Sequence, residues 1–368
     1  MRLKPHVMIV GLRGIPKVEG GIETHVEYLA SRLVNLGCDV EVIGRSPYLS
    51  RSNDSWKGVR ITALPAPKST SFETLIHTFL ATLYAGWKRP DILHFHAIGP
   101  ALFVPLARLL GLHVVVTHHG SDYKREKWGW FASNMLKFGE RFGMRLSHAR
   151  IVISKSIRAE MQSLYNKDCT LIPNGVEIPE IREPGKQLAS FGLRKGHYVI
   201  MVSRFVTEKR QLDLIEAFKL LALEDWKLVL VGSLDTGDGY IEQVRTVAAD
   251  QKNVVLTGFQ SGDDLSELYS NAGAFVLPSS HEGLPIALLE ALSYGLRSLA
   301  SDIDANLEVG LPQQNYFPLG DTAVLAKHLL ALVHSEWSLD NIQDQRAWVA
   351  ENYNWDTIAR QTNEVYRN

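Results

Sequence analysis

Apolar residues recur along this chain in a pattern that predicts alternating strands and helices. Two short apolar runs, HVMIVG at 6–11 and HYVIMVS at 197–203, are typical of strands buried on both faces. Each run is followed by a polar loop and then by apolar residues at helical spacing, at 22–37 and at 212–223. A second strand-like run closes each unit, so both halves of the chain predict a strand, a loop, a helix and a parallel strand.

Further apolar runs extend both halves into larger sheets. The additional strand-like runs lie at 91–96, 113–119 and 149–154 in the first half, and at 254–258, 274–279 and 297–301 in the second. Between the halves, residues 172–192 are rich in Pro, Gly and charge, as is typical of a connection between domains. We therefore predict two Rossmann-like α/β domains, residues 1–180 and 190–354, whose parallel sheets face a central cleft.

The composition indicates a soluble globular protein. The 368 residues are 45% apolar and 21% charged, and 39 basic against 40 acidic side chains give a net charge of −1. This balance argues against nucleic acid as a partner. The two cysteines, Cys38 and Cys169, are too few for a disulfide framework and lack the spacing of metal ligands. We therefore expect both in the core. The sequence shows no signal-like or membrane-spanning run, so we expect a reducing, cytoplasmic location.

Residues 279–295, SSHEGLPIALLEALSYG, place two carboxylates in otherwise apolar sequence. Glu282 follows the predicted strand at 274–279, and Glu290 lies eight positions later inside a helical pattern. Eight helical residues span roughly 12 Å, which is about the reach from the sugar to the ribose of a nucleotide sugar. A diphosphate between them would meet the free amides of the helix N-terminus. The alternative is a surface helix with two solvated glutamates.

The stretch RFVTEKR places two cations just after the predicted strand at 197–203. Arg204 ends that strand and Lys209 lies in the following loop. Because strands of a parallel sheet present their carboxyl ends at one edge, these side chains suit a diphosphate leaving group whose negative charge must be stabilised. A solvated loop is the alternative for this segment.

Taken together, these motifs resemble those of a known family. R-x4-K at 204–209, the pair GF at 258–259 and E-G-L-P-x4-E at 282–290 are similar to the second domain of the family 4 retaining glycosyltransferases, which have the GT-B fold. The first half agrees through GG at 20–21 and T-H-H-G at 117–120.

The resemblance covers nearly the whole chain. S-x3-R at 154–158, IPNGV at 172–176 and the terminal NYNWDTIARQTNEVY also match, and in this family the closing helix, here 355–368, crosses back to the first domain. GLRGIPKVEGGIE and SDYKREKWG further resemble a bacterial subgroup that builds surface polysaccharides (O-antigen, capsule or exopolysaccharide) and includes rhamnosyltransferases.

The resemblance implies a role for each matching residue. Glu282 would bind the donor sugar's hydroxyls with the backbone near Gly283, Leu284 and Pro285, and Glu290 would hold the ribose. Arg204 and Lys209 would contact the diphosphate, as would the amides of Gly20 and Gly21. Gly258 and Phe259 would lie beside the base, and His119 would contact the sugar. Catalysis would then depend on His119, Glu282, Arg204 and Lys209.

The resemblance also implies the chemistry. The expected reaction moves a hexosyl or deoxyhexosyl group, with retention, from a UDP, GDP or dTDP sugar to a glycan or a lipid-linked acceptor. No cofactor and no metal are expected: Asp302 and Asp304 fit a loop with solvated acids, and His94, His96, His118 and His119 show no ligand spacing that supports zinc. One departure is EGLP at 282–285, where the family often has EGFG, which changes the shape around the sugar.

Two other functions remain open. A nucleotide-sugar 2-epimerase shares the GT-B fold and would differ in keeping UDP bound without an acceptor. A two-lobed solute-binding protein belongs to another class, and the absence of a signal-like segment counts against it. A nicotinamide dehydrogenase is disfavoured because GLRGIPKVEGG lacks the G-x-G-x-x-G spacing.

Residues 121–150 suggest contact with an anionic membrane surface. This stretch holds seven Lys or Arg against three Asp or Glu, and it mixes Trp128, Trp130 and Phe131 with Lys124, Arg125 and Lys127. Met135, Phe138, Phe142 and Arg145 continue the pattern at roughly helical spacing. Such a mix suits a peripheral position on the inner face of the cell membrane. The alternative is a helix that packs its aromatic residues into the first domain.

Overall fold

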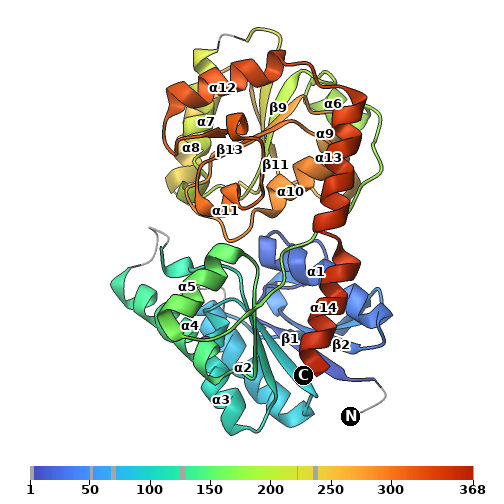
Figure 1. Ribbon diagram of the computed structural model, residues 1–368, viewed down its shortest axis with the longest axis vertical. Coiled ribbons are helices and arrows are strands. Elements are labelled where there is room, and N and C mark those ends of the chain that lie inside the picture. The colour runs from blue at the N-terminus through green and yellow to red at the C-terminus, as the bar shows by residue number, and fades with distance from the viewer. Residues whose placement is uncertain are drawn as a thin grey trace. The chain divides into compact units, whose positions relative to one another are not determined.

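The computed structural model describes residues 4–49, 53–67, 72–124, 129–221, 223–234 and 239–367. The chain divides into two compact units, which we call unit 1 (residues 1–175 with 355–368) and unit 2 (residues 176–354) (Figure 1). The boundary between Gly175 and Val176 lies inside the connection predicted at 172–192, and it comes before residue 180, where the sequence ended the first domain. The reason is local, since Val176 already pairs with Asn354 in an isolated parallel bridge of unit 2.

Unit 1 is built on one sheet. Among the described residues its strand order is β3-β4-β2-β1-β5-β6-β7-β8, and every pair is parallel except β3 with β4. The strands are β1 (His6–Val10), β2 (Asp39–Arg45), β3 (Asn53–Trp56), β4 (Val59–Leu64), β5 (Ile92–His96), β6 (Val114–His118), β7 (Ala149–Val152) and β8 (Thr170–Leu171). The antiparallel hairpin of β3 and β4 was not predicted, because its short strands carry no continuous apolar run.

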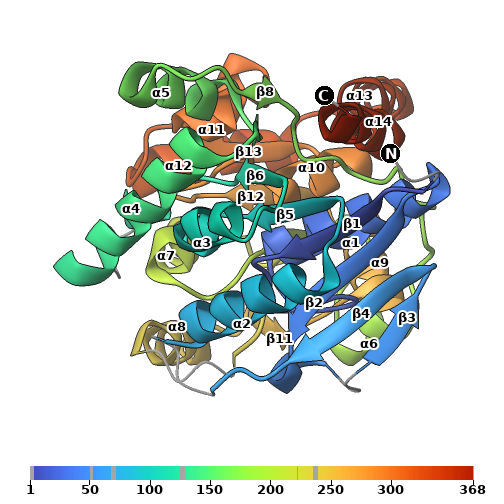
Figure 2. The same cartoon turned by 90° about the horizontal axis from the view of Figure 1, so that it is seen from below.

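Helices cover both faces of this sheet. They are α1 (Gly21–Asn35), α2 (Glu73–Lys88), α3 (Val104–Leu109), α4 (Trp130–Leu146), α5 (Lys155–Tyr165) and α14 (Trp355–Arg367), with short 3-10 turns η1 (Ser46–Tyr48), η2 (Pro100–Phe103) and η3 (Asp122–Lys124). Helices α1 and α14 pack on each other, and α2, α3 and α4 lie in a row on the other side of the sheet (Figure 2).

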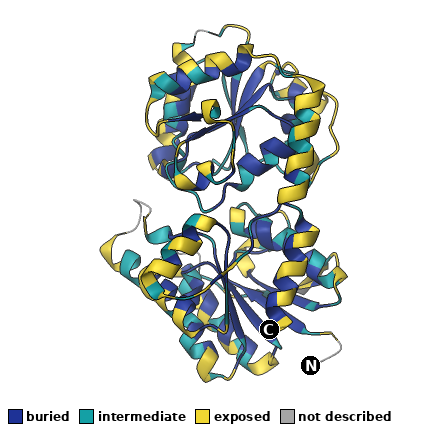
Figure 3. Ribbon diagram, in the orientation of Figure 1, coloured by how far each residue is buried: buried dark blue, intermediate teal, exposed yellow. Residues whose placement is uncertain are grey.

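The alternation of side chains along each strand explains these two layers. Val7 and Ile9 of β1 join a core with Val26 and Leu29 of α1 and Ile358 of α14. The residues between them on β1 point to the opposite face, because successive side chains of a strand alternate. All five residues of β1 are buried, as the apolar run predicted (Figure 3).

Unit 2 repeats the architecture on a smaller sheet. Its described strands are parallel and follow the order β11-β10-β9-β12-β13-β14. Their bounds are β9 (Tyr198–Val202), β10 (Lys227–Val231), β11 (Val254–Gly258), β12 (Ala274–Leu277), β13 (Ser298–Ser301) and β14 (Tyr316–Phe317). The central strand β9 is the one that the run at 197–203 predicted.

The helices of unit 2 flank this sheet. They are α6 (Lys186–Ser190), α7 (Gln211–Leu220), α8 (Gly239–Ala249), α9 (Gly262–Ser270), α10 (Ile286–Ser293), α11 (Asp304–Leu307), α12 (Thr322–His334) and α13 (Leu339–Asn352), with turns η4 (Thr207–Lys209) and η5 (Gln313–Asn315). Phe218 of α7 and Leu329 of α12 are buried in the core beside the strands. None of the helices in the described ranges is both long and apolar enough to cross a membrane.

Candidate active site

An ion pair in unit 2 joins two residues that the sequence singled out separately. Lys209, the last residue of η4, forms an ion pair with Glu282 in the loop after β12, although the two lie 73 positions apart. Only 16% of the Lys209 side chain and 12% of the Glu282 side chain are exposed. The loops are also joined through the backbone, since the Ser280 amide donates to the Glu208 carbonyl over 2.9 Å.

The other predicted diphosphate ligand lies at the same edge of the sheet. Arg204 lies two residues after the end of β9 and is half-buried, and its carbonyl accepts a hydrogen bond of 2.9 Å from the Gln211 side chain at the start of α7. Because β9 lies between β10 and β12, the loops after these strands open on one edge. Two cations and one carboxylate therefore border the carboxyl ends of the central strands.

The turn at Gly258 and Phe259 lies at the outer part of this edge. Gly258 ends β11 with φ +74°, a left-handed conformation that favours glycine, and nothing lies within 4 Å of where a Cβ would stand. Phe259 is 43% exposed. An exposed aromatic ring beside an open glycine turn is suited to stacking on a planar group.

The segment from Gly283 to Pro285 leads into helix α10. Pro285 is the N-cap residue and stands one position before the first helical residue, where its missing N–H costs no helical hydrogen bond. The sequence placed Pro285 in the first turn, so the position differs by one residue. Leu284 is buried and anchors the loop, while Gly283 is half-buried. No side chain caps the N-terminus of α10, and the amides of Leu288 and Leu289 donate to the Pro285 carbonyl over 3.2 Å. The positive end of a helix dipole favours an anion.

Glu290 lies on α10 among buried leucines. Burial raises the pKa of its carboxyl group to about 7, and a hydrogen bond of 3.3 Å from the Tyr269 hydroxyl partly opposes that shift. Tyr269 is held by stacking on Tyr294, with ring centroids 5.0 Å apart. Near neutral pH the Glu290 carboxyl can therefore either accept or donate a hydrogen bond, which suits recognition of a diol.

The two acidic residues after β13 are engaged in structure. The Asp302 carboxylate accepts a hydrogen bond of 2.9 Å from the Leu319 amide, and Asp304 is the first residue of α11. Asp302 thus lies in a loop, as expected, whereas Asp304 begins a short helix.

In unit 1, the glycine pair stands at the N-terminus of α1. Gly20 is the N-cap with φ +147°, and a Cβ there would lie 2.0 Å from a carboxylate oxygen of Glu23. Glu23 also accepts a hydrogen bond of 3.0 Å from the Arg13 amide. The amides of Gly20 and Gly21 thus share their helix end with a carboxylate, which would oppose an incoming phosphate unless Glu23 moves.

The two adjacent histidines of the THHG stretch lie on different sides of β6. His118 ends the strand and contacts Glu140 of α4 over 3.0 Å, while it accepts a hydrogen bond from the Gly120 amide over 3.1 Å. His119 follows the strand, and its Nε2 lies 2.9 Å from Nδ1 of His96. The alternation of a strand thus commits His118 to the interior and leaves only His119 half-buried.

Sequence reasoning missed two residues next to His119. The ring of His25 on α1 meets that of His119 edge to face with centroids 4.9 Å apart, and its Nδ1 lies 2.9 Å from the Asn174 side-chain oxygen. His25 falls on the buried stripe of an amphipathic helix, where a histidine has no distinguishing spacing. Asn174 was quoted only as part of a matching motif. The position of each is decided by tertiary packing.

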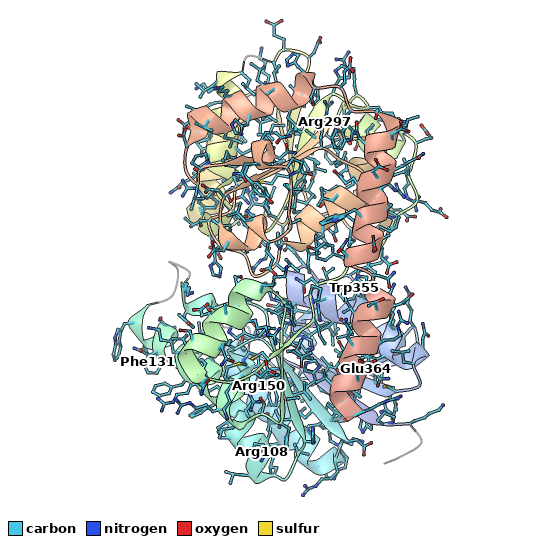
Figure 4. The ribbon with its side chains drawn as sticks, viewed as in Figure 1. Arg108, Phe131, Arg150, Arg297, Trp355 and Glu364 are labelled. Carbon is cyan, nitrogen blue, oxygen red and sulfur yellow. The ribbon has the colours of Figure 1, made fainter. Side chains whose placement is uncertain are left out.

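Helix α14 completes this side of unit 1. Trp355 packs against the rings of both His25 and Tyr28, and Figure 4 labels it at the start of the helix. At the other end, the Tyr366 hydroxyl lies 2.7 Å from Nδ1 of His94. The last helix therefore buttresses the histidines of β5 from the face on which α1 lies.

Comparisons with known proteins agree with this architecture. The sucrose-phosphate synthase of Thermosynechococcus elongatus superposes on this chain with a TM-score of 0.85 at 20% identity. The superposition covers 99% of this chain and 98% of the synthase chain. The Anabaena protein HepE, solved in complex with UDP and glucose, superposes over 98% of each chain with a TM-score of 0.79 at 15% identity. The fold is thus that of a GT-B glycosyltransferase.

Sequence comparison narrows the class. Residues 19–179 match the sequence profile of Glycosyltransferase Family 4, and residues 186–352 match that of Glycosyl transferases group 1. The phosphatidyl-myo-inositol mannosyltransferase of Mycobacterium leprae is 26% identical over 95% of this chain and 93% of its own. The chain is a family 4-like glycosyltransferase, as the motifs indicated.

Proposed function

We propose that this glycosyltransferase takes a hexosyl or deoxyhexosyl group from a nucleoside diphosphate sugar and transfers it with retention of the anomeric configuration. The observation that carries the proposal is the Lys209–Glu282 ion pair at the carboxyl edge of the unit 2 sheet, beside the uncapped N-terminus of α10. The solved HepE complex, whose ligands are UDP and glucose, supports a UDP sugar as the first donor class to test.

The reaction needs charge stabilisation at one place. The bond from the anomeric carbon to the diphosphate oxygen breaks, and the acceptor hydroxyl oxygen forms the new bond on the same face of the sugar. Its proton passes to an oxygen of the departing diphosphate. Lys209 and Arg204 stabilise the charge on that group, and Glu282 orients the sugar through its hydroxyls. The roles of Gly20, Gly21 and His119 stay predictions of the resemblance.

The acceptor we propose is a glycan or a lipid-linked glycan in the synthesis of a bacterial surface polysaccharide, with a rhamnosyl group among the candidate sugars. The name of the mycobacterial relative, a phosphatidyl-myo-inositol mannosyltransferase, supports a lipid-linked acceptor. Such an acceptor would lie in a membrane, so the protein would need a surface that meets lipid.

The face formed by α2, α3 and α4 is suited to anionic lipid. Helix α2 exposes a continuous apolar stripe, and Leu109 of α3 and Trp130 of α4 are 86% and 82% exposed. The exposed large apolar residues of this face are Phe72, Ile76, Phe79, Leu83, Trp87, Leu109, Trp130, Phe131, Phe138 and Leu146. So large an apolar surface indicates an interaction site. Figure 4 shows Phe131 and Arg108 at the outer edge of unit 1.

The charges of this face have one sign. Within the described residues 72–111 and 130–146, each exposed charged side chain is basic: Lys88, Arg89, Arg108, Lys137, Arg141 and Arg145. The acidic residues Glu73 and Glu140 are buried, and Asp91 is half-buried. Lys88 also lies 4.5 Å from the Trp87 ring centre. Aromatic rings among cations fit the headgroup region of an anionic bilayer, whereas a second copy of this face would meet it with like charge.

The structure describes part of the stretch 121–150 that the sequence singled out. Trp130, Phe131 and Phe138 are exposed, which disfavours full packing of these aromatic residues into the domain, while Met135 and Phe142 are half-buried. Arg125, Lys127 and Trp128 lie outside the described residues. Helix α2 was not predicted to contribute, because the sequence shows an apolar helix without showing which face is covered.

A donor screen tests the proposed function. The melting temperature of the purified protein is measured with UDP, GDP and dTDP, and the stabilising nucleotide defines the sugar donors to assay. With a donor and a lipid-linked acceptor, NMR of the product should show the donor's anomeric configuration. Stabilisation by none of the three nucleotides, or an inverted product, would contradict the proposal. Epimerised sugar and tightly held UDP without acceptor would instead identify a 2-epimerase.

A further inference from the structure

Three imidazole rings from three separate elements of unit 1 converge on one point. His25 comes from α1, His96 ends β5, and His119 follows β6. One ring nitrogen from each lies within 4.8 Å of the other two. The ring centroids are 4.9 Å apart for His25 and His119, 5.2 Å for His96 and His119, and 5.5 Å for His25 and His96.

The neighbouring histidines are committed elsewhere. His94 lies within 2.7 Å of both the Tyr366 hydroxyl and the Thr117 hydroxyl, and His118 contacts Glu140. The convergent set is therefore the three rings of His25, His96 and His119. We call this set the three-histidine cluster.

The tautomer of His25 is fixed by its neighbour. Its Nδ1 lies 2.9 Å from the side-chain oxygen of Asn174, which can only accept a hydrogen bond. Nδ1 must therefore carry the proton, and Nε2 keeps its lone pair in the neutral ring. A ring held by a hydrogen bond at the far nitrogen is the arrangement that orients histidine ligands of metals.

His96 and His119 have nitrogen capacity that the protein does not use. Their facing nitrogens, Nδ1 of His96 and Nε2 of His119, lie 2.9 Å apart and can share only one proton. The other nitrogen of His96 is buried and has no hydrogen-bond partner among the described residues. A cation coordinated by the facing nitrogens would replace the shared proton, and the proton of His96 would then lie on its other nitrogen.

The protonation state also favours a metal ion. Burial lowers the pKa of His25 to about 4 and lowers those of His96 and His119 well below 6.5. Imidazole ligates as the neutral ring, so protons do not compete at neutral pH. The donors are all nitrogen, which selects zinc and its neighbours in the first transition series over magnesium or calcium. His119 is half-exposed, so a fourth position can hold water.

We propose that the three-histidine cluster binds one Zn²⁺ or a related divalent transition-metal ion, and that the bound ion inhibits sugar transfer. Binding requires the nitrogens, which lie within 4.8 Å of one another, to close to roughly 3.4 Å around a tetrahedral ion. Inhibition follows because the ion occupies a nitrogen of His119. This second half rests on the proposed function and on the contact of His119 with the donor sugar that the family resemblance implies. The binding half does not depend on any activity.

Cobalt titration tests binding without an assay of transfer. Co²⁺ is added to chelator-treated wild-type protein in the absence of donor, and the visible absorption of a tetrahedral ion should saturate at one equivalent. Zn²⁺ should abolish the absorption, and Mg²⁺ in large excess should not. His25→Gln and His96→Gln should each weaken Co²⁺ binding tenfold or more. Wild-type protein without saturable absorption would overturn the proposal whatever the variants do.

A second histidine pair in unit 1 provides the matched control. His113 and His148 stack with ring centroids 4.1 Å apart, and among the described residues they form no group of three metal-ligating side chains. The double variant His113→Gln/His148→Gln should bind Co²⁺ as the wild type does. If this variant loses the absorption while His96→Gln keeps it, the ion binds at the wrong histidines and the assignment fails.

Kinetics test the inhibitory half separately. Zn²⁺ should raise the apparent KM for the donor, and a chelator should reverse the effect. The residual activity of His25→Gln should resist Zn²⁺ at concentrations that inhibit the wild type. Saturated binding without inhibition would overturn the inhibitory role and leave binding intact. A protein that binds Co²⁺ as expected but transfers no sugar would instead contradict the proposed function.

Discussion

At the scale of single residues, the Lys209–Glu282 ion pair decides how the unit 2 site can work. Each side chain is the other's partner in the protein without substrate, so neither charge is left alone in a largely buried place. A donor would then exchange this contact for contacts of its own, with sugar hydroxyls on Glu282 and diphosphate oxygens on Lys209.

We expect Glu282→Gln and Lys209→Ala each to lower kcat a hundredfold or more. Both groups act on charge or orientation in the transition state rather than on packing, so the folded state should survive. Steady-state kinetics on each purified variant measures the effect, and circular dichroism checks the fold. Lys195, an exposed lysine paired with Glu183 in the same unit, offers a control in Lys195→Ala. A folded Glu282 or Lys209 variant with near-normal kcat would contradict the site assignment.

Glu290 should make the stability of the protein depend on pH. Its pKa is raised from 4.5 to about 7 by burial, so between these values the folded chain holds a proton that the unfolded chain releases. The contribution of Glu290 to the free energy of unfolding is therefore fully present below pH 4.5. It is lost as pH rises towards and through 7, and this loss is at most about 3 kcal/mol.

The variant Glu290→Gln cannot ionise and should lose this component. Chemical denaturation at pH 5 and pH 8 should show a smaller decline in the variant than in the wild type. Equal declines in the two proteins would show that Glu290 keeps an ordinary pKa. Because the comparison is a difference between matched proteins, other titrating groups cancel.

At the scale of elements, helix α2 is apolar in sequence but is covered on one side only. Its buried side carries Ala81 and Ala85 against the sheet, while its opposite side exposes large apolar residues. A helix with both sides apolar is expected to be covered on both. The membrane proposal supplies that cover, and α3 and α4 extend the same face.

We expect Leu83→Asp/Trp87→Asp to weaken binding to anionic vesicles. The change removes apolar area and adds negative charge to a face whose exposed charges are all basic in its described residues. Co-sedimentation with phosphatidylglycerol vesicles measures binding, which should also fall as salt rises. The control is Leu339→Asp in unit 2, since Leu339 and Trp87 are both 74% exposed. Wild type that stays in the supernatant at low salt would refute the membrane surface and leave the transferase proposal unaffected.

At the scale of the whole molecule, the two units repeat one scheme and carry different chemistry. Unit 2 holds the acid and base groups suited to a sugar diphosphate, and unit 1 holds the neutral histidines and the cationic apolar face. Two similar sheets have thus become specialised through their loops and outer helices, where substitutions do not disturb the buried strands.

We expect sugar transfer to proceed without added divalent metal. Lys209 and Arg204 supply the positive charge at the diphosphate, and Asp302 is engaged with the Leu319 amide. Initial rates with EDTA should equal or exceed those without it, because a chelator also removes any inhibitory ion from the three-histidine cluster. Loss of activity in EDTA with recovery on adding Mg²⁺ or Mn²⁺ would return Asp302 and Asp304 to consideration as ligands.

The sequence alone determined the central strands of both sheets, their parallel arrangement and the edge at which the candidate site lies, but it missed the antiparallel hairpin of β3 and β4. Runs such as HVMIVG and HYVIMVS can only be satisfied between two layers of helices, and parallel strands must deliver their following loops to one edge. The sequence therefore predicted four charged residues at or beside that edge: Arg204, Lys209, Glu282 and Glu290. The glycosyltransferase class followed from their combination.

Tertiary structure alone decided which of these groups touch. Three features depend on residues that lie far apart in the chain. They are the Lys209–Glu282 contact, the convergence of His25 with His96 and His119, and the exposure of the outer side of α2. Local sequence sets the period of an element but not its rotation against a neighbour or the layer that covers it. Those are settled by packing over the whole core, because burial of apolar area depends on every element together.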